Sequence, residues 1–399
     1  MTVSCLDNCR IFTGNDIIND HFVVIHDGII ENIAHSSERM PHEAETIDLG
    51  GALLSPGLID IQVNGGGGIL FNASPTVEAI QKIGATHRRF GTTGFLPTLI
   101  SDDLDVVAQA IAAVDSAIEE GVPGVLGIHL EGPFLSTDRK GVHDPQKFCR
   151  LESSHIELLS SLQNGKTILT LAPEKVEPEL IAELAERGVT VFIGHSNATY
   201  IETCQAIEGG AVGFTHLFNA MSQMTGREPG VVGAALESQE TWCGVIVDGR
   251  HVSPVTLRVA FKCKPLDRFV LVTDAMPTVG TNGGAFLLQE RKIRVENEVC
   301  VSQEGTLAGS NLDMEKAVRN AVEMLNLDVG SALRLATANP ALLLGMEANI
   351  GRIAPGFRAD LVSFNDQMEV TSTWIGGERI ASDTPRSGFL HNAVGMNTN

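Results

Sequence analysis

The sequence predicts an α/β fold, a (β/α)8 TIM-like barrel with a small β-sandwich domain built from both chain termini. Two patterns support it: short apolar runs alternate with segments of helical period through the middle of the chain, and both ends are rich in short strands and glycine turns. A length of 399 residues suits one large domain with an appendage. An open, doubly wound sheet is the alternative for such an alternation.

The two ends of the chain share one pattern. Residues 1–54 contain short apolar runs broken by turn-forming pairs such as Asp27-Gly28, and residues 350–385 repeat this pattern. Because the ends of a domain often lie close together, we expect these two segments to form one small β domain. The tail, residues 386–399, is expected to be loosely ordered.

Residues 55–349 carry the alternation expected of a metal-dependent hydrolase barrel. Its eight candidate strands are Leu58–Val63, Gly94–Ile100, Gly124–Leu130, Ile168–Ala172, Val189–Ile193, Val212–His216, Cys243–Val247 and Phe269–Thr273. Helical stretches between them include Val77–Phe90, Leu104–Glu119, Pro178–Arg187, Tyr200–Ala206 and Pro254–Phe261. The segment 281–305 breaks the alternation, and its glycine turn signal predicts a β-hairpin insertion.

Polar side chains end most of these strands. In a barrel of this kind the active site is built at the carboxyl ends of the strands, so such residues are candidates for chemistry. They are Gln62 and Asn64 after strand one, His129 and Glu131 at strand three, His195 at strand five, His216 at strand six, His251 after strand seven and Asp274 at strand eight.

Three of these strand-end residues, Glu131, His195 and His216, form a ligand set typical of catalytic zinc. Each alone has an ordinary structural explanation, but together they predict one divalent metal, with zinc preferred and iron or cobalt also compatible. Such a metal polarises a carbonyl and activates water, so hydrolysis is the predicted reaction class. Asp274, which alone could be a helix N-cap, is then predicted to carry the proton between water and the leaving group.

Longer blocks of the sequence resemble a known superfamily. The run Ser55–Asp60, the strand-end metal set and the late segment Gly351–Gly356 resemble the amidohydrolase superfamily over nearly the whole chain. Within it, five blocks resemble the family of N-acetylglucosamine-6-phosphate deacetylases: His129–Pro133, Gly194–Thr199, Thr215–Met221, Gly226–Gly230 and Leu307–Ser310.

This resemblance implies a reaction and a set of roles. Glu131, His195 and His216 would bind the metal, Asp274 would be the acid and base, and His143 would stabilise the oxyanion. The implied reaction is hydrolysis of the acetamide of N-acetyl-D-glucosamine 6-phosphate by a homodimer. The residues implied to bind the substrate are Val142, His143, Asn219, Ala220, Arg227, His251, Leu307, Ala308 and Gly309.

The sequence departs from the superfamily pattern after strand one. The superfamily usually has His-x-His there, whereas this chain has Gln62 and Asn64. We therefore interpret these two residues as vestigial positions of a second metal and predict one metal ion per subunit. Their identity disfavours cyclic-amide hydrolases and deaminases. It leaves a single-metal amidohydrolase for another N-acyl amino sugar, or a non-catalytic sugar-phosphate sensor, as the alternatives.

The overall charge limits the partners of the protein. With 49 Asp and Glu against 28 Lys and Arg, the formal net charge is −21, which opposes binding to nucleic acid or anionic membranes. A small phosphate could still bind a local cluster of Arg227, His143, His251 and a metal. Seven cysteines without a CxxC pair, a start without an apolar signal core and the lack of long apolar runs predict a cytoplasmic protein.

Overall fold

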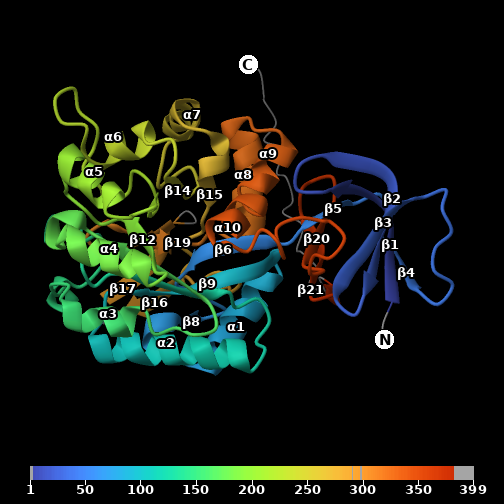
Figure 1. Ribbon diagram of the computed structural model, residues 1–399, viewed down its shortest axis with the longest axis horizontal. Helices are drawn as coiled ribbons and strands as arrows, with labels where there is room; N and C mark the ends of the chain where they lie inside the picture. The colour runs from blue at the N-terminus through green and yellow to red at the C-terminus, as the bar shows by residue number, and fades with distance from the viewer. Residues whose placement is uncertain (1–2, 290, 297–298, 382–399) are drawn as a thin grey trace, which may run out of the picture.

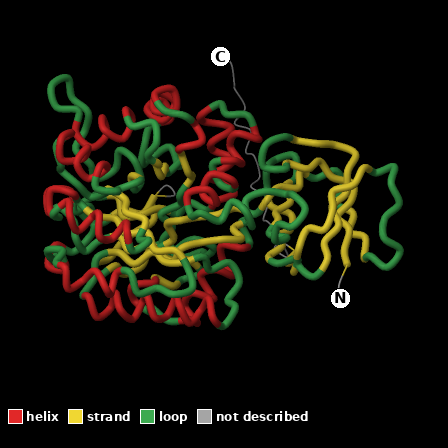
Figure 2. The backbone as a smooth tube through the Cα atoms, in the orientation of Figure 1, coloured by secondary structure: helices red, strands yellow, loops and turns green. Residues whose placement is uncertain are grey.

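The computed structural model describes residues 3–289, 291–296 and 299–381, which form a large α/β body beside a smaller β domain (Figure 1). Strands fill the middle of the large body and helices surround them (Figure 2). The main hydrophobic core lies between these strands and helices. The parallel strands, in the order in which they pair, are β6 (Leu58–Val63), β9 (Thr92–Ile100), β10 (Gly127–Glu131), β11 (Lys166–Leu171), β12 (Thr190–Ile193), β13 (Gly213–Phe214), β14 (Trp242–Val245) and β15 (Phe269–Leu271).

The sheet closes on itself. Val63, at the end of β6, forms a parallel bridge with Ala275, which follows β15. The Asp274 N–H also donates to the Gln62 carbonyl oxygen at 3.0 Å. These contacts join the first and eighth strands, so the predicted barrel is confirmed and the doubly wound alternative is wrong.

The five helical stretches named from the sequence are all present, because their apolar side chains recur at helical spacing. In α2 (Leu104–Glu119) the buried positions run from Val107 to Ala117 on one face. The other four are α1 (Val77–Arg88), α4 (Pro178–Glu186), α5 (Tyr200–Glu208) and α7 (Pro254–Cys263). The structure adds helices that the sequence analysis did not name: α3 (Ser153–Leu159), α6 (Gly230–Glu237), α8 (Met314–Leu325), α9 (Val329–Arg334) and α10 (Ala338–Leu343). None of the helices in the described ranges is both long and apolar enough to cross a bilayer.

The smaller domain joins the two ends of the chain in one sheet. Strand β5 (Leu53–Pro56) pairs antiparallel with β20 (Leu361–Phe364), which brings the two ends of the chain together. Its remaining strands are β1 (Val3–Phe12), β2 (Ile17–His26), β3 (Ile29–His35), β4 (Glu45–Asp48), β21 (Val370–Ile375) and β22 (Glu378–Ala381). The predicted tail, 386–399, and the last residues of the predicted domain, 382–385, lie outside the described residues.

The insertion after the eighth strand is larger than predicted. Instead of a hairpin over 281–305, it is a four-stranded antiparallel sheet of β16 (Ala285–Leu288), β17 (Arg291–Glu296), β18 (Val299–Val301) and β19 (Leu307–Ser310). Strand β19 lies beyond the predicted segment, where it pairs antiparallel with β18. Leu288 and Ile293 of this sheet pack on Ile100 and Met276, so the insertion covers the mouth of the barrel.

Candidate active site

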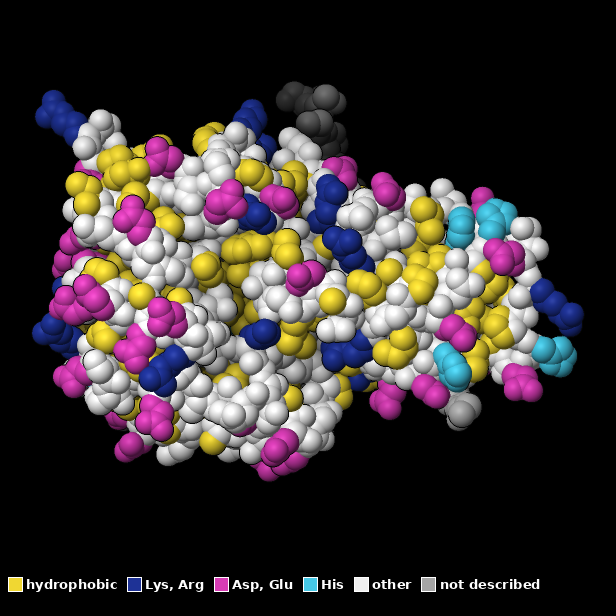
Figure 3. Space-filling model, in the orientation of Figure 1, with side chains coloured by type: hydrophobic (Ala, Val, Ile, Leu, Met, Phe, Trp, Pro, Cys, Tyr) yellow, Lys and Arg dark blue, Asp and Glu magenta, His cyan; other side chains and the backbone are white. Residues whose placement is uncertain are grey.

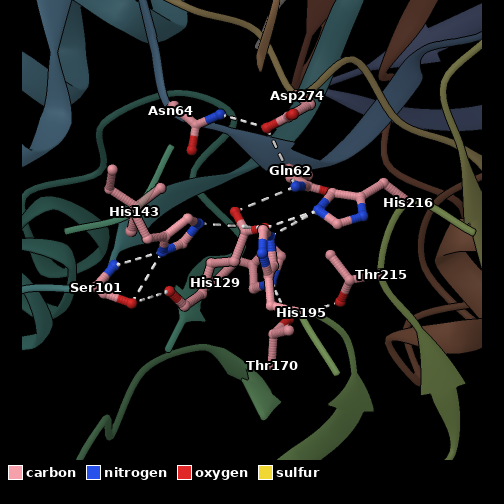
Figure 4. Close-up of polar contacts among 12 residues, drawn as sticks. Gln62, Asn64, Ser101, His129, His143, Thr170, His195, Thr215, His216 and Asp274 are labelled. Atoms are coloured by element: carbon pink, nitrogen blue, oxygen red, sulfur yellow. Dashed lines mark hydrogen bonds and ion pairs between the residues drawn. The ribbon is translucent and has the colours of Figure 1, made fainter. Parts of the chain in front are cut away.

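Three side chains meet at the carboxyl end of the barrel (Figure 4). Glu131 ends β10, and His195 and His216 each lie two residues beyond β12 and β13. The Nε2 atoms of both histidines lie 2.9 Å from Glu131 Oε1 and 3.1 Å from each other. All three residues are buried. The structure therefore brings together the three residues that the sequence nominated as metal ligands.

The chemistry of these donors fits a metal cation. His195 Nδ1 lies 2.9 Å from the Arg139 carbonyl oxygen. Because a carbonyl oxygen only accepts, Nδ1 carries the proton, and in the neutral ring that binds metal Nε2 then presents its lone pair towards Glu131 Oε1. Two lone pairs this close repel unless a positive charge lies between them. A divalent metal bound by one carboxylate and two imidazoles meets that requirement.

Unusual backbone conformations aim the site residues inward. His195, His216 and Asp274 all have positive φ, at 47°, 32° and 53°. Each such non-glycine residue costs about 1–3 kcal/mol and persists only where its surroundings enforce it. At Asp274 the enforcement comes from β19, because the Ser310 N–H donates to the Asp274 carbonyl at 2.8 Å.

Two side-chain amides, those of Asn64 and Gln62, hydrogen-bond to Asp274 beside the ligand set. Asn64 Nδ2 donates to Asp274 Oδ1 at 2.6 Å, and Gln62 Nε2 lies 3.2 Å from the same oxygen. Gln62 Nε2 also lies 3.3 Å from Glu131 Oε2, so it links the two carboxylates. Burial, together with the negative charge of Glu131, raises the pKa of Asp274 to about 6. Such a carboxyl group can exchange a proton near neutral pH.

His143 presents a neutral N–H donor beside the same ligand set. The Ser101 N–H points at His143 Nδ1 at 3.4 Å, so Nδ1 accepts and Nε2 carries the proton. Nε2 lies 4.0 Å from Glu131 Oε1. Burial, aided by the nearby His195, lowers the pKa of His143 to about 3, so the ring is uncharged. It can therefore donate a hydrogen bond without carrying a charge.

The insertion sheet holds the His143 segment, a role that the sequence did not indicate. Gln289, in the β16–β17 turn, donates through Nε2 to the Ser101 carbonyl at 2.7 Å and accepts from the Asp144 N–H at 3.2 Å. Ser101 Oγ also lies 2.9 Å from His143 Nδ1. Gln289 and Ser101 thus hold the His143 imidazole on its Nδ1 side, opposite the Nε2 that faces Glu131. No motif marks either residue, because their contacts join segments far apart in the chain.

His129 lies on the strand that carries Glu131 but outside the ligand set. Its Nε2 is 2.8 Å from Thr170 Oγ1, which in turn is 2.6 Å from Thr215 Oγ1. Burial lowers the pKa of His129 to about 4. The residue therefore belongs to a neutral hydrogen-bonded network that fills the barrel interior.

The metal-ligand set opens into a cavity of about 360 Å³. A further wall residue, His251, is held by Asp248, whose Oδ2 lies 2.6 Å from its Nδ1. Burial alone would raise the pKa of Asp248, but this hydrogen bond and the charge of His251 hold the pKa below its usual value. Of the predicted substrate residues, those lining the cavity are Val142, His143, Asn219, Ala220, His251, Leu307 and Gly309.

Two predicted substrate residues lie elsewhere. Ala308 is buried in the apolar cluster beneath the insertion sheet. Arg227 is exposed on the loop before α6 and does not line the cavity within the described part of the chain. Among the cavity-lining residues that the sequence did not single out are two charged ones, Asp138 and Arg139.

Comparison with known proteins identifies the family. Residues 53–380 match the model of the amidohydrolase family, and residues 5–54 match the model of the NagA composite domain. The chain belongs to the amidohydrolase family. A metal-ligand set at the barrel mouth agrees with this membership, because amidohydrolases depend on metal.

Several relatives match nearly the full chain. An N-acetylgalactosamine-6-phosphate deacetylase from Shewanella sp. (strain ANA-3) is 41% identical, covering 93% of this chain and 94% of its own. An N-acetylglucosamine-6-phosphate deacetylase from Haemophilus influenzae is 33% identical, covering 94% and 98%. The crystal structure of N-acetylglucosamine-6-phosphate deacetylase from Pasteurella multocida superposes with a TM-score of 0.92 at 34% identity, covering 95% of this chain and 100% of its own. This amidohydrolase is thus similar over nearly its whole length to proteins named as deacetylases of amino-sugar phosphates.

Proposed function

We propose that this amidohydrolase hydrolyses the acetamide of N-acetyl-D-glucosamine 6-phosphate to D-glucosamine 6-phosphate and acetate, in amino-sugar catabolism. One observation carries the proposal: a single cavity is lined by a buried Glu-His-His metal-ligand set, a proton-exchanging carboxyl group and a neutral imidazole donor. These are the parts that hydrolysis of an unactivated amide requires. The names and full-length similarity of the relatives support the choice of substrate.

The metal is proposed to be one divalent ion per subunit held by Glu131, His195 and His216. Zinc is our choice, with iron or cobalt as alternatives, because two imidazoles and one carboxylate suit these ions better than magnesium or calcium. When bound, such an ion supplies a Lewis acid that polarises the amide carbonyl and activates water.

The chain's own residues then handle the protons and the developing charge. Asp274 takes a proton from the attacking water and returns it to the nitrogen as the C–N bond breaks. His143 Nε2 donates a hydrogen bond to the oxyanion, a contribution worth about 2.7–4 kcal/mol in comparable sites. Asn219 and Ala220 bind the sugar at the cavity wall.

The phosphate is proposed to bind His251, Arg227 and the segment Leu307–Gly309. Arg227 lies outside the cavity of its own chain, so we propose that it reaches the phosphate in the cavity of a second subunit. The exposed apolar side chains of Ile201 and Met224, on α5 and the Arg227 loop, support a homodimer through this face. Arg227→Ala should then raise KM for the phosphorylated substrate while leaving metal content unchanged.

We also propose that the protein acts in the cytoplasm. All seven cysteines are unpaired, as expected where thiols stay reduced. The excess of acidic residues gives no reason to expect nucleic acid or membranes as partners.

The test is an acetate-release assay on purified protein of measured metal content. Wild type should release acetate from N-acetylglucosamine 6-phosphate and much less from N-acetylglucosamine. Asp274→Asn should keep metal and fold but lose turnover by about 10²–10⁴-fold, because the proton carrier is gone. Binding of the sugar phosphate without any acetate release would instead favour the sugar-phosphate sensor.

One observation favours a second substrate. The relative named for N-acetylgalactosamine 6-phosphate is 41% identical to this chain, against 33% for the one from Haemophilus influenzae named for the glucosamine epimer. The two sugars differ only in the orientation of the hydroxyl group at C4. Comparing kcat/KM for both epimers in the same assay decides which is preferred.

A further inference from the structure

Asn64 carries a buried oxygen atom that nothing in the described chain satisfies. The residue is 0% exposed and lines the active-site cavity. Its Nδ2 donates to Asp274 Oδ1, and its Oδ1 has no hydrogen-bond partner. In Figure 4 this oxygen points away from Asp274, towards the side of the cavity where His143 lies. The amide thus presents one bonded face to the acid–base residue and one open acceptor to the cavity.

The orientation of this amide is fixed. The ionised Asp274 carboxylate only accepts hydrogen bonds, so the NH2 group faces Asp274 and the oxygen faces the cavity. The backbone is held as well, because the Phe71 N–H donates to the Asn64 carbonyl at 2.8 Å. Rotation cannot supply a partner without breaking the bond to Asp274. A buried acceptor without a partner costs free energy, so a hydrogen-bond donor on a bound ligand would remove that cost.

We propose that Asn64 Oδ1 accepts the N–H of the scissile amide, so that the site selects secondary amides. This rests on the proposed function. The leaving nitrogen must come within hydrogen-bond reach of Asp274 to receive its proton. Asn64 is bonded to that same carboxylate, so a nitrogen placed there also lies beside the open oxygen. At the reacting group of an N-acyl sugar, the amide N–H is the sole donor.

This contact makes Asn64 a specificity-determining residue with a role in catalysis. An amide nitrogen becomes basic only when its lone pair leaves conjugation and points at the proton donor. With its N–H held by Asn64 Oδ1, the nitrogen can turn its lone pair towards Asp274. The proton then passes from Asp274 to nitrogen, and the electron pair of the breaking C–N bond stays on nitrogen. Asn64 is therefore a working part of the site rather than only a vestigial metal position.

Gln62 supplies a matched control. Like Asn64, it donates a side-chain N–H to Asp274. Unlike Asn64, it is not among the residues that line the cavity. Gln62→Leu therefore removes hydrogen bonds to Asp274 and Glu131 but no acceptor that faces the cavity, whereas Asn64→Leu removes one to Asp274 and the acceptor for the substrate.

The experiment compares two substrates with these variants. One is N-acetylglucosamine 6-phosphate, and the other is 2-O-acetylglucose 6-phosphate, whose ester oxygen replaces the N–H. Asn64→Leu should lower the ratio of kcat/KM for amide over ester by about tenfold or more relative to wild type. Gln62→Leu should leave the ratio unchanged while slowing both reactions. Equal loss on both substrates in Asn64→Leu would overturn the proposal.

A binding measurement without turnover gives a second readout. In metal-depleted protein, calorimetry should show that wild type prefers the amide to the ester and that Asn64→Leu loses this preference. If Asn64→Leu does not fold, Asn64→Ala makes the same comparison. Wild type that deacetylates no amino-sugar phosphate would defeat the proposed function, whereas wild-type turnover with an unchanged amide-to-ester ratio in the variant would defeat only this inference.

Discussion

The histidines of this protein differ sharply between its two domains. In the small β domain His35 and His42 are exposed, and histidines on the visible face gather over this domain (Figure 3). The barrel holds five buried histidines, each at most 5% exposed: His87, His129, His143, His195 and His216. The difference shows that the number of histidines carries little information about function. Burial at the carboxyl end of a barrel strand carries much more.

The physical basis of this difference is hydration. An exposed imidazole keeps its water, so its protonation has little consequence for the fold. A buried imidazole needs protein partners, and these partners decide its charge. Burial lowers the pKa of His143 to about 3, whereas at His216 the bonded Glu131 carboxylate overcomes burial and raises the pKa. Changing one histidine from each group therefore tests the comparison directly.

The largest effect is expected at a metal ligand. His195→Ala removes one of three converging donors, so metal content should fall and turnover should drop by about 10³-fold or more, because several kcal/mol of transition-state stabilisation are lost. Metal analysis and acetate release measure both. His35→Ala, in the exposed group, should change neither. Full metal content in His195→Ala would contradict the assignment of the ligand set.

A smaller, more selective effect is expected at His143. His143→Leu removes the N–H donor at the oxyanion but none of the three ligands, so kcat should fall by about 10²–10³-fold with metal content unchanged. Because His143 stays neutral above a pKa of about 3, it does not set the activity loss on acidification between pH 7 and 5. That loss should follow Asp274, whose raised pKa is about 6 and which must be ionised to accept a proton. If the loss of activity between pH 7 and 5 disappeared in His143→Leu, the assignment of that loss to Asp274 would be wrong.

The barrel and the ligand set could be predicted because both follow from local patterns. Short apolar runs marked the strands, because parallel barrel strands are buried on both faces, and the residue after a buried strand in a closed barrel points to the mouth. This placed Glu131, His195 and His216 together without any knowledge of their distances. The positive φ of His195 and His216 could not be predicted, because non-glycine residues rarely adopt it.

Other parts of the site depend on contacts between distant segments. Gln289 fixes Ser101 across 188 positions of sequence, and no pattern near either residue signals this contact. Helix α6 was missed for a different reason: Gly230–Leu236 is buried all round, so it lacks the amphipathic period that marks a surface helix. Arg227 was placed with the substrate by resemblance, and one chain alone does not bring it to the cavity.

The smallest expected effect separates burial from catalysis within the barrel group. His87 lies on α1, away from the ligand set, and its Nε2 donates to the Gly65 carbonyl at 2.9 Å. Burial lowers its pKa to about 4, below the ordinary value of about 6.5. The unfolded chain therefore binds a proton at His87 between pH 6.5 and 4 that the folded protein does not. Stability from this residue is complete above pH 6.5 and is lost as pH falls, by about 3 kcal/mol near pH 4.

His87→Gln removes this titration and can still donate to the Gly65 carbonyl. The free energy of unfolding of the variant should therefore fall less steeply than that of wild type between pH 6.5 and 4.5. Chemical denaturation at several pH values measures the two slopes, and kcat should be unchanged because His87 contributes no group to the cavity. The exposed His42→Gln should reproduce the wild-type slope. Parallel slopes for wild type and His87→Gln would show that burial in this barrel does not by itself make a histidine acid-sensitive.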